Sequence, residues 1–192
     1  SSYLVTTLAD TVDASDGAMS LREAIIAAVN GDTITFASSL AGGTITLSGA
    51  ALTITQGVTI DATGIAGAGG ITIDGNNASR IFFIDGGSAT NPVVLNHLKI
   101  TGGYASYGGA IRVSTGRHLT LIDCAITGNN APSGGGGVYN TGTARFYGCT
   151  IAGNTSQNGS GGVYNRGNYA TEAVYFYNTI IAENFGNQGS GQ

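Results

Sequence analysis

The sequence contains few charged residues: Asp, Glu, Lys and Arg make up 9% of its 192 residues, against about 25% in an ordinary globular domain. A composition this poor in charge can indicate a membrane protein, but no apolar run approaches the ~18 residues of a membrane-spanning helix. Basic residues form no stripe, and the net charge of −4 gives a pI of about 4.8. Nucleic acid is therefore not an expected partner.

Glycine, by contrast, is abundant, with 33 residues dispersed along the chain. It separates short apolar runs rich in Ile, Val, Thr, Phe and Tyr, a pattern that predicts strands and turns rather than helices. Residues 123–129 (DCAITGN) return as 148–154 (GCTIAGN), and residues 136–142 (GGVYNTG) return as 161–167 (GGVYNRG), each 25 positions later. A repeat of about 20–50 residues indicates a solenoid, propeller or array.

A 25-residue repeat is too short for a propeller blade, which needs about 40–45 residues. It suits one turn of a single-stranded parallel β-helix, an all-β solenoid whose turns stack about 4.8 Å apart. The three strands of one turn are expected at Val138–Asn140, Ala144–Tyr147 and Cys149–Gly153. Residues one repeat apart then lie directly above one another, so Ile126 and Ile151 should be neighbours.

The repeat divides the chain, which we treat as a single domain, into three parts. Residues 1–31 are expected to form an N-terminal cap, residues 32–97 irregular turns, and residues 98–192 the regular turns. No signal peptide is visible, and the sequence stops where another strand of the repeat is expected. We therefore expect a fragment of a longer protein, with the solenoid interrupted within a turn.

Residues 20–29 have a helical pattern. Ser20, followed three positions later by Glu23, is a capping box, in which each side chain satisfies a free backbone N–H group. Apolar residues then fall on one stripe, which consists of Leu21, Ala24, Ile25, Ala28 and Val29. We expect this short amphipathic helix to end at Asn30-Gly31 and to cover the open edge and the core of the first turn.

Two groups of motifs resemble known families. Residues 19–25 (MSLREAI), followed by residues 31–36 (GDTITF), resemble the CSLREA domain of large bacterial secreted and surface proteins, with Met19 in place of the usual cysteine. The later half is similar to the repeats of chlamydial-type polymorphic outer-membrane proteins, in which Gly-Gly-Ala-Ile and Phe-x-x-Asn motifs recur. The matching segments are residues 108–111, 126–129, 151–154 and 181–184, the last three with Ile in place of Phe. The resemblance implies a right-handed, pectin-lyase-like β-helix, located outside the cell or on the bacterial surface, with an adhesin-type or unassigned function and no catalytic residues.

Asparagines should stack at two corners of the coil. One column consists of Asn129, Asn154 and Asn184, and the other of Asn140 and Asn165. Stacked amides can hydrogen-bond along the axis, and Asn tolerates the left-handed backbone of a sharp turn. We interpret both columns as structural rather than ligand-binding.

Cys124 and Cys149 should stack on the inside of the coil. Parallel Cβ vectors aim the sulfurs poorly for a disulfide, so buried thiols are favoured over a bridge, and the redox compartment stays open. Asp10, Asp13 and Asp16 offer ligands for calcium, but their spacing is not that of a known calcium loop. A solvated loop is the favoured interpretation there, and no metal or cofactor is predicted.

Candidate catalytic residues are sparse. Polysaccharide lyases and hydrolases need clustered acids and a basic partner, and the best acid pair is Asp61 and Asp85, which may be neighbours on one face if a turn spans 24 residues. Lys99 with Asp74 is a possible ion pair. The remaining basic side chains are scattered and match no acid at the repeat distance: His97, Arg112, Arg117 and His118.

Tyr139 and Tyr164 should stack on the outside of the coil, with Arg112 at the aligned position one turn earlier. A ladder of Tyr and Arg suits recognition of proteins or sugars, although Tyr is also a good structural strand residue. Threonines at 33/35, 44/46 and 53/55 raise the alternative of an ice-binding surface, but their spacing drifts from turn to turn.

These observations favour a non-enzymatic extracellular module, an adhesin or stalk segment whose rigid face binds a protein or glycan. Its other expected neighbours are further turns of the same parent protein. A polysaccharide lyase or hydrolase and an ice-binding protein are the alternatives. The sequence leaves the ligand, the length of the parent protein and the oligomeric state open.

Overall fold

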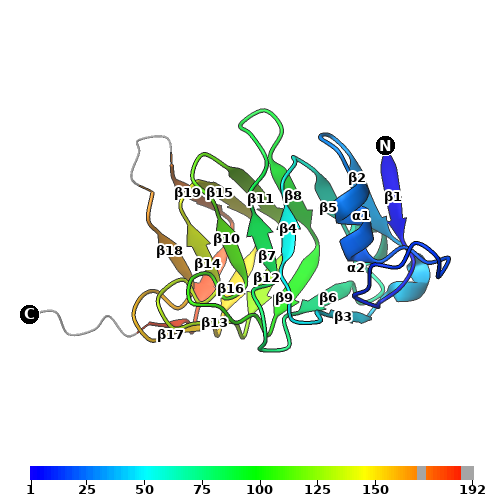
Figure 1. Ribbon diagram of the computed structural model, residues 1–192. Coiled ribbons are helices and arrows are strands. Elements are labelled where there is room, and N and C mark those ends of the chain that lie inside the picture. The colour runs from blue at the N-terminus through cyan, green and yellow to red at the C-terminus, as the bar shows by residue number, and fades with distance from the viewer. Residues whose placement is uncertain (168–171, 187–192) are drawn as a thin grey trace, which may run out of the picture.

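The chain winds into a parallel β-solenoid of about seven turns. The computed structural model describes residues 1–167 and 172–186 (Figure 1). The turns follow one another from the N-terminal to the C-terminal end, so the ribbon colours change steadily along the axis (Figure 1). This arrangement confirms the predicted all-β parallel solenoid. No helix of the described residues is long and apolar enough to cross a membrane.

Each strand pairs in parallel with strands of neighbouring turns, which distributes the described strands among four sheets. Sheet 1 contains β1 (Ser2–Val5), β2 (Thr33–Phe36), β5 (Thr59–Asp61), β8 (Val93–Asn96), β11 (His118–Ile122), β15 (Thr143–Tyr147) and β19 (Val174–Tyr177). Sheet 2 contains β4 (Leu52–Ile54), β7 (Phe82–Ile84), β10 (Ile111–Val113), β14 (Val138–Asn140) and β18 (Val163–Asn165). Sheet 3 contains β3 (Thr44–Thr46), β6 (Ile71–Asp74), β9 (Leu98–Thr101), β12 (Ala125–Thr127), β16 (Thr150–Ala152) and β20 (Ile180–Ala182). Sheet 4 contains β13 (Asn130–Ala131), β17 (Thr155–Ser156) and β21 (Phe185–Gly186). The helical segments are α1 (Leu21–Ala27), α2 (Thr63–Ala66) and the 3-10 helix η1 (Ser38–Leu40).

The register of the later turns is the one that the repeat predicts. Ile126 of β12 pairs with Ile151 of β16, and with Ile100 of β9 on the other side. The next pairing joins Ile151 to Ile181 of β20 although 30 residues separate them. Extra residues at a corner therefore leave the register of the strands unchanged.

The core lies inside the coil and consists of stacked aliphatic columns. In sheet 3 one such column is 0–1% exposed over successive turns, and it contains Ile45, Ile73, Ile100, Ile126 and Ile151. Neighbouring side chains such as Thr44 and Lys99 alternate with these isoleucines and point to solvent. Since each buried isoleucine contributes about 1.5–3 kcal/mol, the columns hold successive turns together.

Helix α1 covers the N-terminal end of the coil beside β4, β1 and β2 (Figure 1). The predicted capping box is present: Ser20 Oγ accepts from the Glu23 N–H, and the Glu23 carboxylate accepts from the Ser20 N–H. At the other end of the helix, Gln56 Nε2 donates to the carbonyl oxygens of Ile25 and Ala28, both at 2.8 Å. Both ends of the helix are thus tied into the first turns of the solenoid.

The helix is shorter than predicted, and this corrects one residue of its apolar stripe. It ends at Ala27, and Ala28 already has an extended backbone with ψ of 148°. The first four stripe residues are buried, but Val29 is 63% exposed. The stripe was drawn at helical spacing past the point where the helix ends, so Val29 turns to solvent.

Both predicted asparagine columns are present. The Nδ2 of Asn129 donates to Asn154 Oδ1, and the Nδ2 of Asn154 donates to Asn184 Oδ1, each at 2.9 Å. In the second column, Asn140 Nδ2 donates to Asn165 Oδ1 at 2.8 Å. Asn129, Asn140 and Asn154 are at most 1% exposed, so each column satisfies polar groups inside the corners of the coil.

The two cysteines are free thiols buried in the core, as predicted. Cys124 Sγ donates to the carbonyl oxygens of Leu95 and Ile122, each at 3.3 Å. Burial is the largest influence on the pKa of the Cys124 thiol and raises it. The thiol is therefore a core side chain rather than a nucleophile.

The C-terminal end of the coil exposes side chains that would belong to the core one turn earlier. Phe176 stacks on buried Phe146 at 5.1 Å but is itself 42% exposed, and Ile181 is 49% exposed. No described residue covers them, and Phe185 adds a further 70% exposed ring. This end therefore presents an apolar surface and unpaired strand edges.

Candidate functional site

The outward side of sheet 2 carries a column of aromatic and arginine side chains. The register places Phe83 of β7 beside Arg112 of β10, Arg112 beside Tyr139 of β14, and Tyr139 beside Tyr164 of β18. This confirms the alignment of Arg112, Tyr139 and Tyr164 and adds Phe83 to it. We call the column and its neighbours the arginine–tyrosine face, which consists of Arg80, Phe83, Tyr107, Arg112, Tyr139, Tyr164 and Arg166.

Two guanidinium groups contact one phenyl ring on this face. The Cζ atoms of Arg80 and Arg112 both lie 5.7 Å from the centre of the Phe83 ring. Arg112 Cζ also lies 6.0 Å from the centre of the Tyr139 ring. Cation–π attraction stabilises each arginine in place, so both charges are held close together.

Arg80 has a structural role as well as a charge. Its Nε donates to the carbonyl oxygen of Gly108 at 3.0 Å, and its Nη2 donates to that of Tyr107 at 2.6 Å. These bonds hold the segment that carries the Tyr107 ring. Burial, followed by repulsion from Arg112, lowers the pKa of Arg80 to about 10. At neutral pH Arg80 is still a cation, and the positive charge of Arg112 opposes it.

Arg112 is less satisfied than Arg80. It makes no hydrogen bond to any described residue, and its Nε is buried without a partner. A buried donor without an acceptor costs about 1–3 kcal/mol. Within residues 1–167 and 172–186, no salt bridge involves Arg80 or Arg112. The face therefore holds unneutralised cationic groups in a protein whose net charge is negative.

The expected exposure of the tyrosine ladder is wrong at Tyr139. The rings of Tyr139 and Tyr164 are stacked at 5.4 Å with an angle of 1° between their planes. Tyr139 is nevertheless only 4% exposed, because Tyr107 packs on it at 4.9 Å and Arg166 Nη1 donates to its hydroxyl at 3.3 Å. Side chains outside the coil cover Tyr139, which alternation along one strand does not reveal. Tyr164 is partly exposed.

The predicted acid pair is not formed. Asp61 ends β5 in sheet 1 and pairs with Asn96, 35 residues later, whereas Asp85 follows β7 of sheet 2. The turn after Asp61 contains α2 and is longer than the 24 residues assumed. The pair of Lys99 with Asp74 is also absent, since Lys99 Nζ donates to the carbonyl oxygen of Gly69 at 2.8 Å.

Sequence reasoning missed a different pair, His97 with Asp123. The two residues occupy the same corner of successive turns, with φ of 56° and 49°, and His97 Nε2 lies 3.6 Å from Asp123 Oδ2. Asn96 Nδ2 donates to the Asp61 carboxylate, so Asn96 Oδ1 faces His97 Nδ1 at 2.7 Å. That amide orientation makes Nδ1 the donor in the neutral ring. Their 26-residue offset was the available signal.

The His97–Asp123 pair borders a shallow pocket of about 250 Å³ that Lys99 also lines. Histidine and aspartate at this distance can exchange a proton with a bound group. Asp123 is half-exposed, as expected of a surface ion pair. The pocket shows an acid–base pair without a further polar group aimed into it.

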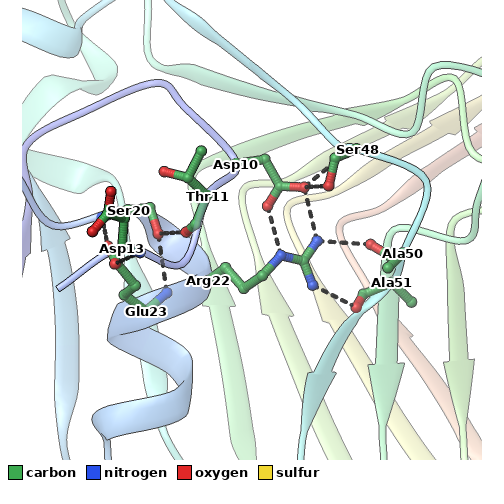
Figure 2. A network of polar contacts seen from close by, with 9 residues as sticks. All are labelled: Asp10, Thr11, Asp13, Ser20, Arg22, Glu23, Ser48, Ala50 and Ala51. Carbon is green, nitrogen blue, oxygen red and sulfur yellow. Dashed lines mark hydrogen bonds and ion pairs between the residues drawn. The ribbon is translucent and has the colours of Figure 1, made fainter. Parts of the chain in front are cut away.

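The aspartates at 10, 13 and 16 organise the N-terminal cap (Figure 2). The Asp10 carboxylate accepts from Arg22 Nε and Nη2 at 2.8 and 2.9 Å, and Arg22 also donates to the carbonyl oxygens of Ala50 and Ala51 (Figure 2). Asp13 accepts from Ser15, and Asp16 from the Ala18 N–H. In the described part of the chain no group of three or more His, Cys, Asp or Glu residues could hold a metal ion.

The threonine rows do not extend into a flat array. Thr33 continues to Thr59 and Thr44 to Thr72. Other positions change residue type at the next turn, and the rows at 35, 46 and 53 continue as Asp61, Asp74 and Phe83. The register therefore gives no repeated threonine surface across successive turns.

No family model, no curated protein and no solved structure matches the chain. The resemblance to CSLREA domains and to polymorphic outer-membrane repeats therefore stays a prediction.

Proposed function

We propose that the chain is a non-enzymatic binding module, an adhesin or stalk segment of a large bacterial surface or secreted protein. In this proposal a protein or glycan ligand contacts the arginine–tyrosine face. The observation that carries the proposal is the guanidinium of Arg112, which is partly buried between two aromatic rings without a hydrogen-bond partner among the described residues. A ligand that accepts hydrogen bonds there would satisfy it.

The solenoid supports this role by its stiffness. Every turn is paired along its strands with the turns before and after it, so side chains on one face keep a fixed spacing of about 4.8 Å along the axis. Arginine and tyrosine are also the residue types that contribute most to protein recognition surfaces. A rigid row of both suits a module that binds without rearranging.

The test is binding of the whole chain to glycan and peptide arrays. Arg112→Gln and Tyr164→Ala should each weaken the captured ligands about tenfold, because each removes a contact from the face. The matched control is Arg145→Gln on sheet 1, where Arg145 stacks over the Tyr175 ring at 5.1 Å. Tyr139→Ala is a poor probe because Tyr139 is buried. Ligands that all three variants bind as the parent chain does would refute the proposal.

A further inference from the structure

We infer that the arginine–tyrosine face binds an acidic segment of a partner protein, with a carboxylate seated against Arg112 and next to Arg80. This inference rests on the proposed function and names the ligand for it. It depends on three properties of the face: its unneutralised charge, the donors that Arg112 still has free, and the orientation of its tyrosine rings.

The charge of the face calls for an anion. Lys and Arg total seven in the sequence, and three of the seven lie on this face as Arg80, Arg112 and Arg166. Arg80 and Arg112 share the Phe83 ring and repel each other. Asp85, the acid next to β7, forms no salt bridge with either of them in the described part of the chain. A bound carboxylate would relieve the repulsion between the two guanidinium groups.

The donors of Arg112 fit a carboxylate in particular. A guanidinium presents a planar fork of N–H groups that binds both oxygens of a carboxylate at once. The rings of Phe83 and Tyr139 hold the Arg112 guanidinium on two sides, so little side-chain freedom is lost on binding. The pre-placed fork distinguishes Arg112 from a freely moving surface arginine.

The tyrosine rings favour a peptide over a sugar. Sugars stack on open aromatic faces, but Tyr139 and Tyr164 turn their faces toward each other. A Cβ atom added at Gly134 or Gly159 would lie 3.6 or 3.5 Å from Cδ2 of Tyr164, so these glycines pass against the ring. What the ladder offers outward is ring edges. An extended acidic peptide needs no open ring face, and its alternate side chains point to one side.

The experiment measures fluorescence anisotropy of a labelled peptide of alternating Glu and Thr added to the whole chain, with the Gln and Thr counterpart as the neutral probe. We expect the acidic peptide to bind, the neutral one to bind about tenfold or more weakly, and added salt to weaken binding. Arg112→Gln should reduce the affinity for the acidic peptide about tenfold or more. Arg112→Lys keeps the charge but loses the fork, and it should recover only part of that loss.

The matched control is again Arg145→Gln, which should stay within about twofold of the parent chain. Thermal unfolding followed by circular dichroism establishes that each variant is folded. Equal affinity for the acidic and neutral peptides, or equal losses in Arg112→Gln and Arg145→Gln, would overturn the inference. An oligogalacturonate that binds through Arg112 while the acidic peptide does not would overturn the peptide assignment and leave the proposed function standing. Arrays whose ligands are all insensitive to Arg112 would remove both.

Discussion

Replacing Asn129 by alanine should be among the most destabilising single changes in the regular turns. Its Oδ1 accepts from the buried Gly103 N–H at 2.8 Å. Its Nδ2 donates to the carbonyl oxygens of Ile100 and Thr127 at 3.2 and 3.0 Å, and to Asn154 Oδ1 at 2.9 Å. Alanine removes all of these bonds in a site that is 1% exposed.

The magnitude follows from the groups that lose their partners. The Gly103 N–H loses its acceptor without access to water, and two carbonyl oxygens each lose a donor. Since one buried unsatisfied group costs about 1–3 kcal/mol, the expected loss in the free energy of unfolding is about 2–4 kcal/mol. Asn165→Ala is the control, because Asn165 is exposed and its partner Asn140 keeps a bond of 2.7 Å to the Gly142 carbonyl oxygen. That variant should lose about 0.5–1 kcal/mol.

The assay is urea unfolding followed by far-ultraviolet circular dichroism, with the midpoint and the m-value compared between variants. Asn129→Asp should be at least as unstable as Asn129→Ala, because a carboxylate would face oxygen atoms where the amide donated. If Asn129→Ala and Asn165→Ala lose the same stability at unchanged m-value, the column does not act as described. The same holds if Asn129→Asp is as stable as the parent chain.

Further predictions concern the cap and the core. Hydrogen bonds from Arg22 outweigh the upward effect of burial and keep the pKa of the Asp10 carboxyl below its ordinary 3.8, so its stabilising contribution is complete above pH 3.8 and is lost as the pH falls through the folded-state pKa; acid titration of parent and Asp10→Asn should differ only below that range. Ser20→Ala should cost about 1 kcal/mol through loss of the capping box, measured by urea unfolding, and an unchanged midpoint would contradict the role of the cap. Cys124 and Cys149 should react with a colorimetric thiol reagent only after unfolding, since both are buried; rapid reaction of the native chain would contradict this.

The later turns could be predicted from the sequence because identical residue types recur at one offset. Ile126 and Ile151 mark the same strand position, and only one register keeps both inside. The earlier turns hold no such repetition, and helix α2 and long corners vary their length. The pairing of Asp61 with Asn96 rather than with a residue near Asp85 follows from that variation.

Exposure was harder to predict than register, and this shaped the candidate site. Alternation along β14 correctly placed Tyr139 beside Tyr164 and Arg112. It carried no information about Tyr107, which reaches over Tyr139 from a corner of the previous turn. The burial of a residue on the outside of a coil depends on loop side chains, and no period in the sequence records their positions.

The pairing of each turn with its immediate neighbours also determines how the molecule would respond to being pulled from its two ends. A force along the chain loads the outermost turn first, while inner turns stay hydrogen-bonded to each other. Each turn that peels away would release roughly 85 Å of chain, at about 3.4 Å for each of some 25 residues. A stalk built this way would lengthen in steps under tension and would re-form by winding back onto the turns that remain.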